Sequence, residues 1–118
     1  MGDELPVSDR PISEQYRIVA KEWVDAEAAA HLLEETKSVV LEQRKNALIA
    51  STNISDAAAE RLVKASDEWH EHVKVICRAR AKANLLRVKL KYVEMRHREW
   101  VGANADARAE LRLAGGDP

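Results

Sequence analysis

The sequence predicts an all-α protein, a long antiparallel helical hairpin resembling a coiled coil, with a short helix at the turn. Three observations predict this fold class. The 118-residue chain is 33% charged and only 4% aromatic, which is typical of long amphipathic helices. Two long stretches lack proline, and apolar residues recur along both at spacings of three and four. A chain of this length is also expected to form a single domain.

The first long helix is expected to begin near Pro11, because proline is favoured in the first turn of a helix, and to reach about Ala50. Neither glycine nor proline interrupts this stretch. Its packing stripe consists of Ile12, Tyr16, Val19, Trp23, Ala26, Ala30 and Leu33. We therefore predict a flexible lead at residues 1–10, a helical hairpin domain at 11–114 and a flexible C-terminus at 115–118.

The turn is expected at residues 51–55, where serine, threonine and asparagine compete with helical hydrogen bonding. Ser55 or Asn53 is a suitable N-cap for a short second helix. Ser66, followed by two acidic residues, has the features of another helix start. The last helix is expected to continue from there to about Leu113, before the glycines and proline that end the chain.

The last helix carries two apolar stripes on roughly opposite faces. The first contains Ile76, Ala79, Ala83, Leu86, Leu90, Val93, His97 and Trp100. The second contains Cys77, Ala81, Leu85, Val88, Tyr92 and Met95. Antiparallel pairing places Trp23 near Val93, so the first stripe faces the first helix. A helix that is apolar on two faces is normally buried on both, so the second stripe predicts a homo-oligomer, most simply a dimer forming a four-helix bundle. The alternative is that these are scattered surface residues, which proteins tolerate.

Charge is distributed unevenly, although the whole chain has a net charge of only -1. The segment Val73–Arg98 holds nine basic residues and one acid, a local balance of +8. Candidate nucleic-acid-binding residues are Arg78, Arg80, Lys82, Arg87, Lys89, Lys91, Arg96 and Arg98, because rows of cations can contact phosphates. The alternative is pairing with the first helix, where Ile18–Gln43 holds six acids and two bases, a balance of -4.

Motifs of enzyme chemistry are absent from the sequence. It has no glycine-rich phosphate loop, nucleophile elbow or pair of Cys-x-x-Cys motifs, so we expect no catalysis and no cofactor. His70 and His72 point to different faces of a helix, whereas a helical zinc pair needs a spacing of three or four, so no metal is expected. Cys77 is interpreted as a small buried apolar residue of the second stripe and not as a nucleophile.

The expected location is the cytoplasm. Cys77 is the only cysteine, which fits a reducing compartment. The N-terminal residues lack the pattern of an export signal, and no run approaches the ~18 apolar residues that a membrane span requires. We expect no membrane association.

Three segments resemble small α-helical proteins of unknown function that tailed bacteriophages and prophages encode. They are ISEQYRIVAKEWVDAEAAAHLLEETKS (Ile12–Ser38), KASDEWHEHV (Lys64–Val73) and KANLLRVKLKYVEMRHREW (Lys82–Trp100). The resemblance implies a phage or prophage origin, action in the cytoplasm of the bacterial host, and genes of DNA replication or recombination nearby. It assigns no functional residue.

The sequence thus favours a non-catalytic, oligomeric helical binding protein that acts as a protein-interaction or scaffolding module. Its expected partners are further copies of itself and a host protein. The alternative is a nucleic-acid-binding accessory of phage replication or recombination that uses the basic rows of the last helix.

Overall fold

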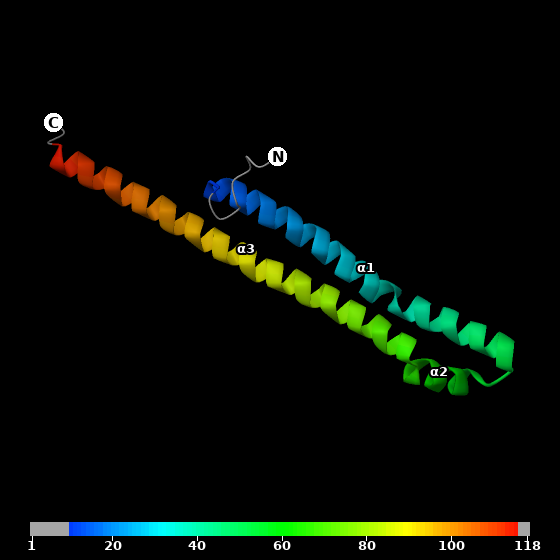
Figure 1. Cartoon of the computed structure of the whole chain (residues 1–118). Coiled ribbons are helices and arrows are strands. Elements are labelled where there is room, and N and C mark those ends of the chain that lie inside the picture. The colour runs from blue at the N-terminus through cyan, green and yellow to red at the C-terminus, as the bar shows by residue number, and fades with distance from the viewer. Residues whose placement is uncertain (1–9, 116–118) are drawn as a thin grey trace, which may run out of the picture. The chain divides into compact units, whose positions relative to one another are not determined.

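A computed structural model describes residues 10–115 of the chain. The predicted flexible ends, 1–10 and 115–118, lie almost entirely outside the described residues. Within 10–115 the chain forms three α-helices and no strand: α1 (Ile12–Thr52), α2 (Asp56–Ala65) and α3 (Asp67–Ala114) (Figure 1). The predicted fold class, two long helices joined through a short one, is confirmed. The assembly of hairpins into a bundle stays a prediction.

The two ends of α1 follow from local backbone chemistry. Pro11 precedes the helix, and its carbonyl accepts a hydrogen bond from the Gln15 N–H at 3.0 Å. At the other end Asn53 adopts a left-handed conformation with φ 53°, and its N–H donates to the Ile49 carbonyl at 2.9 Å. Asparagine tolerates this conformation better than other residues that have a Cβ. It therefore ends α1 and turns the chain.

Two serines form the corners around α2. The Ser55 hydroxyl accepts a hydrogen bond from the Ala58 N–H at 3.2 Å and caps the start of α2. The Ser66 N–H donates to the Val63 carbonyl at 3.0 Å, which closes α2. The Ser66 hydroxyl also accepts from the Trp69 N–H at 3.2 Å and so caps α3. Both predicted caps are confirmed.

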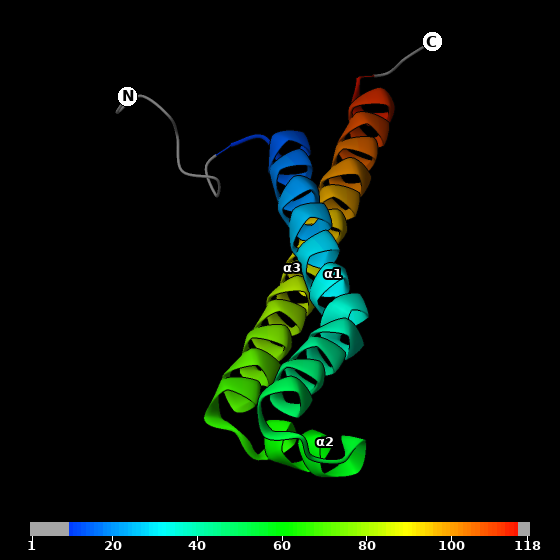
Figure 2. The same cartoon turned by 90° about the vertical axis from the view of Figure 1, so that its right-hand side faces the viewer.

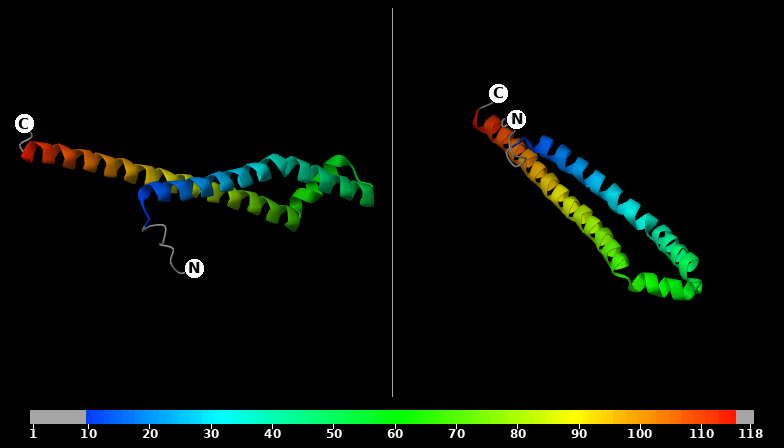
Figure 3. Two further views of the ribbon diagram at one scale, coloured as in Figure 1. Left: turned by 90° about the horizontal axis from the view of Figure 1, so that it is seen from above. Right: turned by 45° about the vertical axis from the view of Figure 1, so that its right-hand side comes forward.

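The described residues divide into two compact units, and both long helices contribute to each. In the first unit, residues 10–23 of the chain pack against residues 85–115, and Figures 1 and 3 show the start of α1 beside the second half of α3. The core of this unit is Val19, Leu90 and Val93, with Ile12, Ala20 and Trp23 packed against it. Trp23 therefore lies against the cluster that contains Val93, as the sequence predicts.

The second unit, Val24–Asn84, contains the rest of α1, all of α2 and the first part of α3. Figure 2 shows α2 at the bottom of the view, where it connects the end of α1 to the start of α3. Its buried apolar residues are Ala26, Ala30, Ala59, Val63, Trp69, Ile76 and Ala83. Alanines dominate where α1 meets α3, and small side chains at a contact shorten the distance between helix axes. The buried alanines therefore allow the two helix backbones to approach closely in this unit.

Burial of the first stripe on α3 ends at Val93. His97 and Trp100, which the sequence also places in that stripe, are exposed. The reason is the start of α1 at Ile12, which leaves little helix to cover the later turns of α3. Trp100 instead stacks on His97, with ring centroids 6.2 Å apart.

Candidate interaction surface

The second apolar stripe of α3 is exposed along its whole length. In the second unit Cys77 and Ala81 are exposed. In the first unit the exposed fractions are 69% for Leu85, 65% for Val88, 60% for Tyr92 and 57% for Met95. No described residue covers these side chains. The predicted role of the stripe as an oligomer interface stays a prediction, since the structure contains one chain.

The four exposed residues of the first unit form a coiled-coil seam. Leu85, Val88, Tyr92 and Met95 follow one another at spacings of three, four and three, which are those of alternating a and d positions in a heptad repeat. We call these four residues the seam. On the other side of the same helix, Leu90 and Val93 are buried against α1. One face of α3 therefore builds the hairpin, and the seam is available to another helix.

Basic residues border the seam on both sides. With Leu85 at an a position, Lys89 and Arg96 occupy e positions, and Lys91 and Arg98 occupy g positions. We call these four residues the basic flanks. Three of the four are exposed and Arg96 is half-buried. Residues 10–23 and 85–115 together hold ten basic and six acidic residues, a balance of +4, against nine and ten, or -1, in Val24–Asn84.

Arg80 is the one predicted nucleic-acid-binding residue that the described part of the chain neutralises. Its Nε and Nη2 donate to the two carboxylate oxygens of Glu34 at 2.9 and 2.6 Å, and its Nη1 donates to Glu27 at 2.7 Å. The hydrogen bond from Arg80 lowers the pKa of the Glu34 carboxyl. The carboxylates in turn raise the pKa of Arg80, Glu34 more than Glu27. For Arg80 the structure supports pairing between the helices over contact with nucleic acid.

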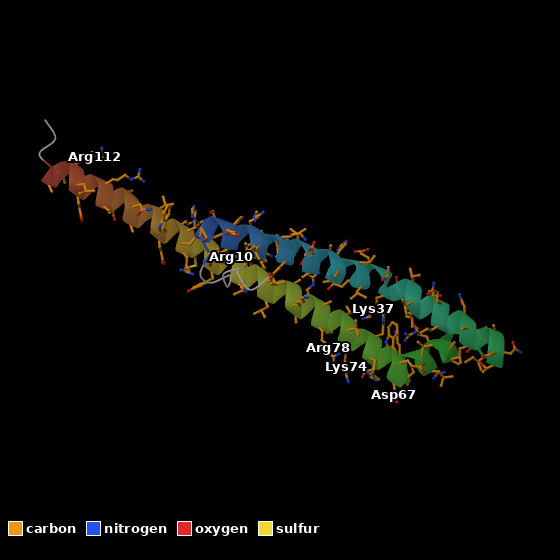
Figure 4. The ribbon with its side chains drawn as sticks, turned by 45° about the horizontal axis from the view of Figure 1, so that its top comes forward. Arg10, Lys37, Asp67, Lys74, Arg78 and Arg112 are labelled. Atoms are coloured by element: carbon orange, nitrogen blue, oxygen red, sulfur yellow. The ribbon has the colours of Figure 1, made fainter. Side chains whose placement is uncertain are left out.

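The other seven predicted residues form no ion pair with any residue in the described range. They are Arg78, Lys82, Arg87, Lys89, Lys91, Arg96 and Arg98. Figure 4 shows Arg78 with Lys74 on the side of α3 away from α1. The acidic surplus of α1 thus neutralises one of the eight candidate cations, Arg80, because the carboxylates that reach α3 belong to Glu27 and Glu34. Most of the basic surface remains available.

A hollow at the turn was not predicted. It lies within the second unit and has a volume of about 580 Å³. Its lining residues are Arg44, Ala47, Leu48, Ser51, Leu62, Val63, Ser66 and Glu68. Next to it the Arg44 guanidinium lies 5.9 Å from the centroid of the Trp69 ring, and the His72 ring lies 5.6 Å from it. The one sequence feature that could have indicated this hollow is Trp69, an aromatic residue three positions after the helix cap Ser66.

Lys45 was also missed by sequence reasoning. Its side chain is buried, and its Nζ donates to Asp56 at 3.0 Å and to Glu42 at 3.1 Å. These hydrogen bonds, that to Asp56 first, raise the pKa of the Lys45 ammonium. The contact joins α1 to the first turn of α2.

The fold and the site define an all-α hairpin whose candidate site is a helix surface. Across the described helices, none combines the length and the apolar character needed to traverse a lipid bilayer. Within residues 10–115, no three His, Cys, Asp or Glu side chains are grouped to hold a metal ion. Comparison of the chain with protein-family models, with curated proteins and with solved structures gives no match.

Proposed function

We propose that this chain is a non-catalytic protein-interaction module that binds a helix through the seam of α3. The observation that carries the proposal is the exposure of four apolar side chains in heptad spacing on a helix whose other face is already buried. Burying apolar surface contributes about 25 cal/mol per Å², so covering the seam favours association.

The proposal keeps the bacterial cytoplasm as the place of action and a phage or prophage as the origin. Both rest on the resemblance of three helical segments to small phage proteins. The binding role rests on the surface of α3 alone and is tested independently of the origin.

Solution mass, measured by light scattering, tests whether the seam joins copies of this chain. One chain has a mass of 13.3 kDa. A larger mass that returns to that of one chain in Leu85→Gln identifies the seam as the interface of a homo-oligomer. The matched control is Leu111→Gln, since Leu111 lies on the same helix and is 71% exposed. A monomer in every buffer would exclude self-association, and the module then requires a helix from another protein.

A second candidate function is nucleic-acid binding, which the seven unpaired basic residues favour. Each phosphate contact contributes about one unit to the slope of log affinity against log salt. We expect Lys89→Glu with Arg96→Glu to abolish retention of a short duplex at low salt and Arg108→Glu with Arg112→Glu to have a smaller effect. Absence of retention by the wild-type chain at low salt would eliminate this candidate.

A further inference from the structure

The charges beside the seam identify the kind of helix that it accepts. Resting on the proposed function, we propose that the seam binds the apolar face of an acidic amphipathic helix from a partner protein. Residues at e and g flank the contact between paired helices and select the partner by charge. Here all four flanking side chains, Lys89, Lys91, Arg96 and Arg98, are basic. A partner with Glu or Asp at its own e and g positions therefore matches both edges.

A second copy of the same seam is the wrong partner by this criterion. In a parallel pair each g residue faces an e residue of the other helix, and in an antiparallel pair e faces e and g faces g. Each arrangement sets cations of the basic flanks against cations. Glu94 does not relieve this repulsion, because it falls at a c position, away from the contact. Glu99 falls at the a position that follows the seam, and it is one carboxylate against four cations on each copy. Like charges across an interface disfavour that partner.

The chain does not neutralise the basic flanks internally. Residues 10–23, which include the start of α1, hold three basic and two acidic residues. They have no surplus of carboxylates. None of the four flanking residues forms an ion pair with a residue between 10 and 115. Their charges are therefore available to a partner.

The shape of the seam favours a helix over a membrane or a nucleic acid. A helix that lies on a membrane buries a broad apolar face, more than about 100° wide. A seam limited to a and d positions is narrower than that. Phosphate groups would pair with the flanks but would leave Leu85, Val88, Tyr92 and Met95 without apolar contacts. An amphipathic helix covers the seam and pairs the flanks at once.

Two synthetic peptides serve as probes for the full chain. Both contain three heptads with isoleucine at a and leucine at d. One has glutamate at every e and g position and the other has lysine there, and like charges keep each peptide from pairing with itself. At low salt we expect the glutamate peptide to bind at least about tenfold more tightly than the lysine peptide, because it can form four cross-helix charge pairs of modest strength. High salt should shrink the difference.

Matched variants assign the effect to named side chains. Leu85→Gln should reduce binding of the glutamate peptide about tenfold or more, with Leu111→Gln close to wild type. Lys89→Glu with Arg96→Glu should shift the preference toward the lysine peptide. The control pair, Arg108→Glu with Arg112→Glu, should keep the preference for glutamate. Circular dichroism of each variant verifies that the helices are retained.

The outcomes separate this inference from the proposed function. Equal binding of the two peptides that is lost in Leu85→Gln would overturn the acidic partner and retain the interaction module. Binding of neither peptide by a monomeric wild-type chain would contradict both. Self-association through the seam would also overturn the acidic partner. So would seam-dependent binding to phosphatidylserine vesicles or to duplex DNA, if the chain does not discriminate between the two peptides.

Discussion

The two units of the chain join the same two helices by different interactions. In the first unit the contact is apolar and centres on Val19, Leu90 and Val93. In the second unit small residues such as Ala83 meet at the contact, and the ion pairs of Arg80 with Glu27 and Glu34 cross it. The ion pairs of Arg80 join the helices in the unit where α1 supplies an acidic surplus. The other seven candidate cations of α3, two of them in the second unit, remain available for another molecule.

Removing the apolar core of the first unit should have the largest effect on stability. Leu90 is 7% exposed, and Leu90→Ala should lower the free energy of unfolding by roughly 3 kcal/mol, since it loses buried methyl groups and leaves a cavity. Urea denaturation followed by circular dichroism measures the change. Leu85→Ala, at an exposed position of the same helix, should change stability by less than about 0.5 kcal/mol. If the two variants lose the same unfolding free energy, the assignment of Leu90 to the buried face and Leu85 to the exposed face of α3 is wrong.

Enlarging a buried alanine should destabilise the contact between the helices in the second unit. Ala83 is fully buried, and Ala83→Leu should cost roughly 1–3 kcal/mol of unfolding free energy because the added atoms force α1 and α3 apart. Ala81→Leu is the matched control, since Ala81 is exposed. A stabilised Ala83→Leu protein would show that the contact contains a cavity large enough for the added side-chain atoms.

Breaking the ion pairs of Arg80 should weaken the second unit by less than Ala83→Leu does. Arg80→Ala leaves Glu27 and Glu34 without a cation, and Arg80→Lys retains the charge but cannot bind Glu34 through two parallel hydrogen bonds. We expect both variants to unfold at lower temperature, with alanine the worse. Arg78→Ala, which removes an unpaired cation, should unfold like the wild type. Hydrogen exchange should accelerate within Val24–Asn84 first.

Acid should produce the smallest of these effects. Arg80 holds the pKa of Glu34 below the ordinary value of 4.5, so the unfolded chain binds more protons than the folded chain between these two values. The stability from this pair is fully present above about pH 4.5 and is lost as the pH falls through the lowered pKa. Glu34→Gln should therefore lose less stability than wild type on acidification. Glu35→Gln, whose carboxylate contacts only the exposed His31, at 3.8 Å, should follow the wild-type profile.

Sequence patterns were sufficient for the helices and their caps. Spacings of three and four predict both long helices to within a few residues, because helix periodicity is a local property. Ser55 and Ser66 were predictable for the same reason, since a cap acts on backbone groups two or three positions away. The opposite exposures of Leu85 and Leu90 also follow from their positions on the helix.

Pairings between distant residues were not predictable from pattern. The sequence offers six acids in Ile18–Gln43 for the basic rows, yet Arg80 binds Glu27 and Glu34 and the other seven predicted cations bind none of the described residues. Register and side-chain geometry decide which charges meet, and neither is encoded by charge counts. The exposure of Trp100 was missed for a similar reason. It depends on where α1 begins relative to α3, which is a tertiary relation.

The last turns of α3 extend past the start of α1 (Figure 3), and in this stretch, residues 101–114, only Asn104 and Ala109 are even half-buried. Isolated helices shorter than about 12–15 residues are marginal in water, so this end of α3 should fray continually. Its backbone amides should exchange with solvent much faster than those beside Leu90. A protease should cut there first, shortening α3 from its C-terminus while the seam is left whole.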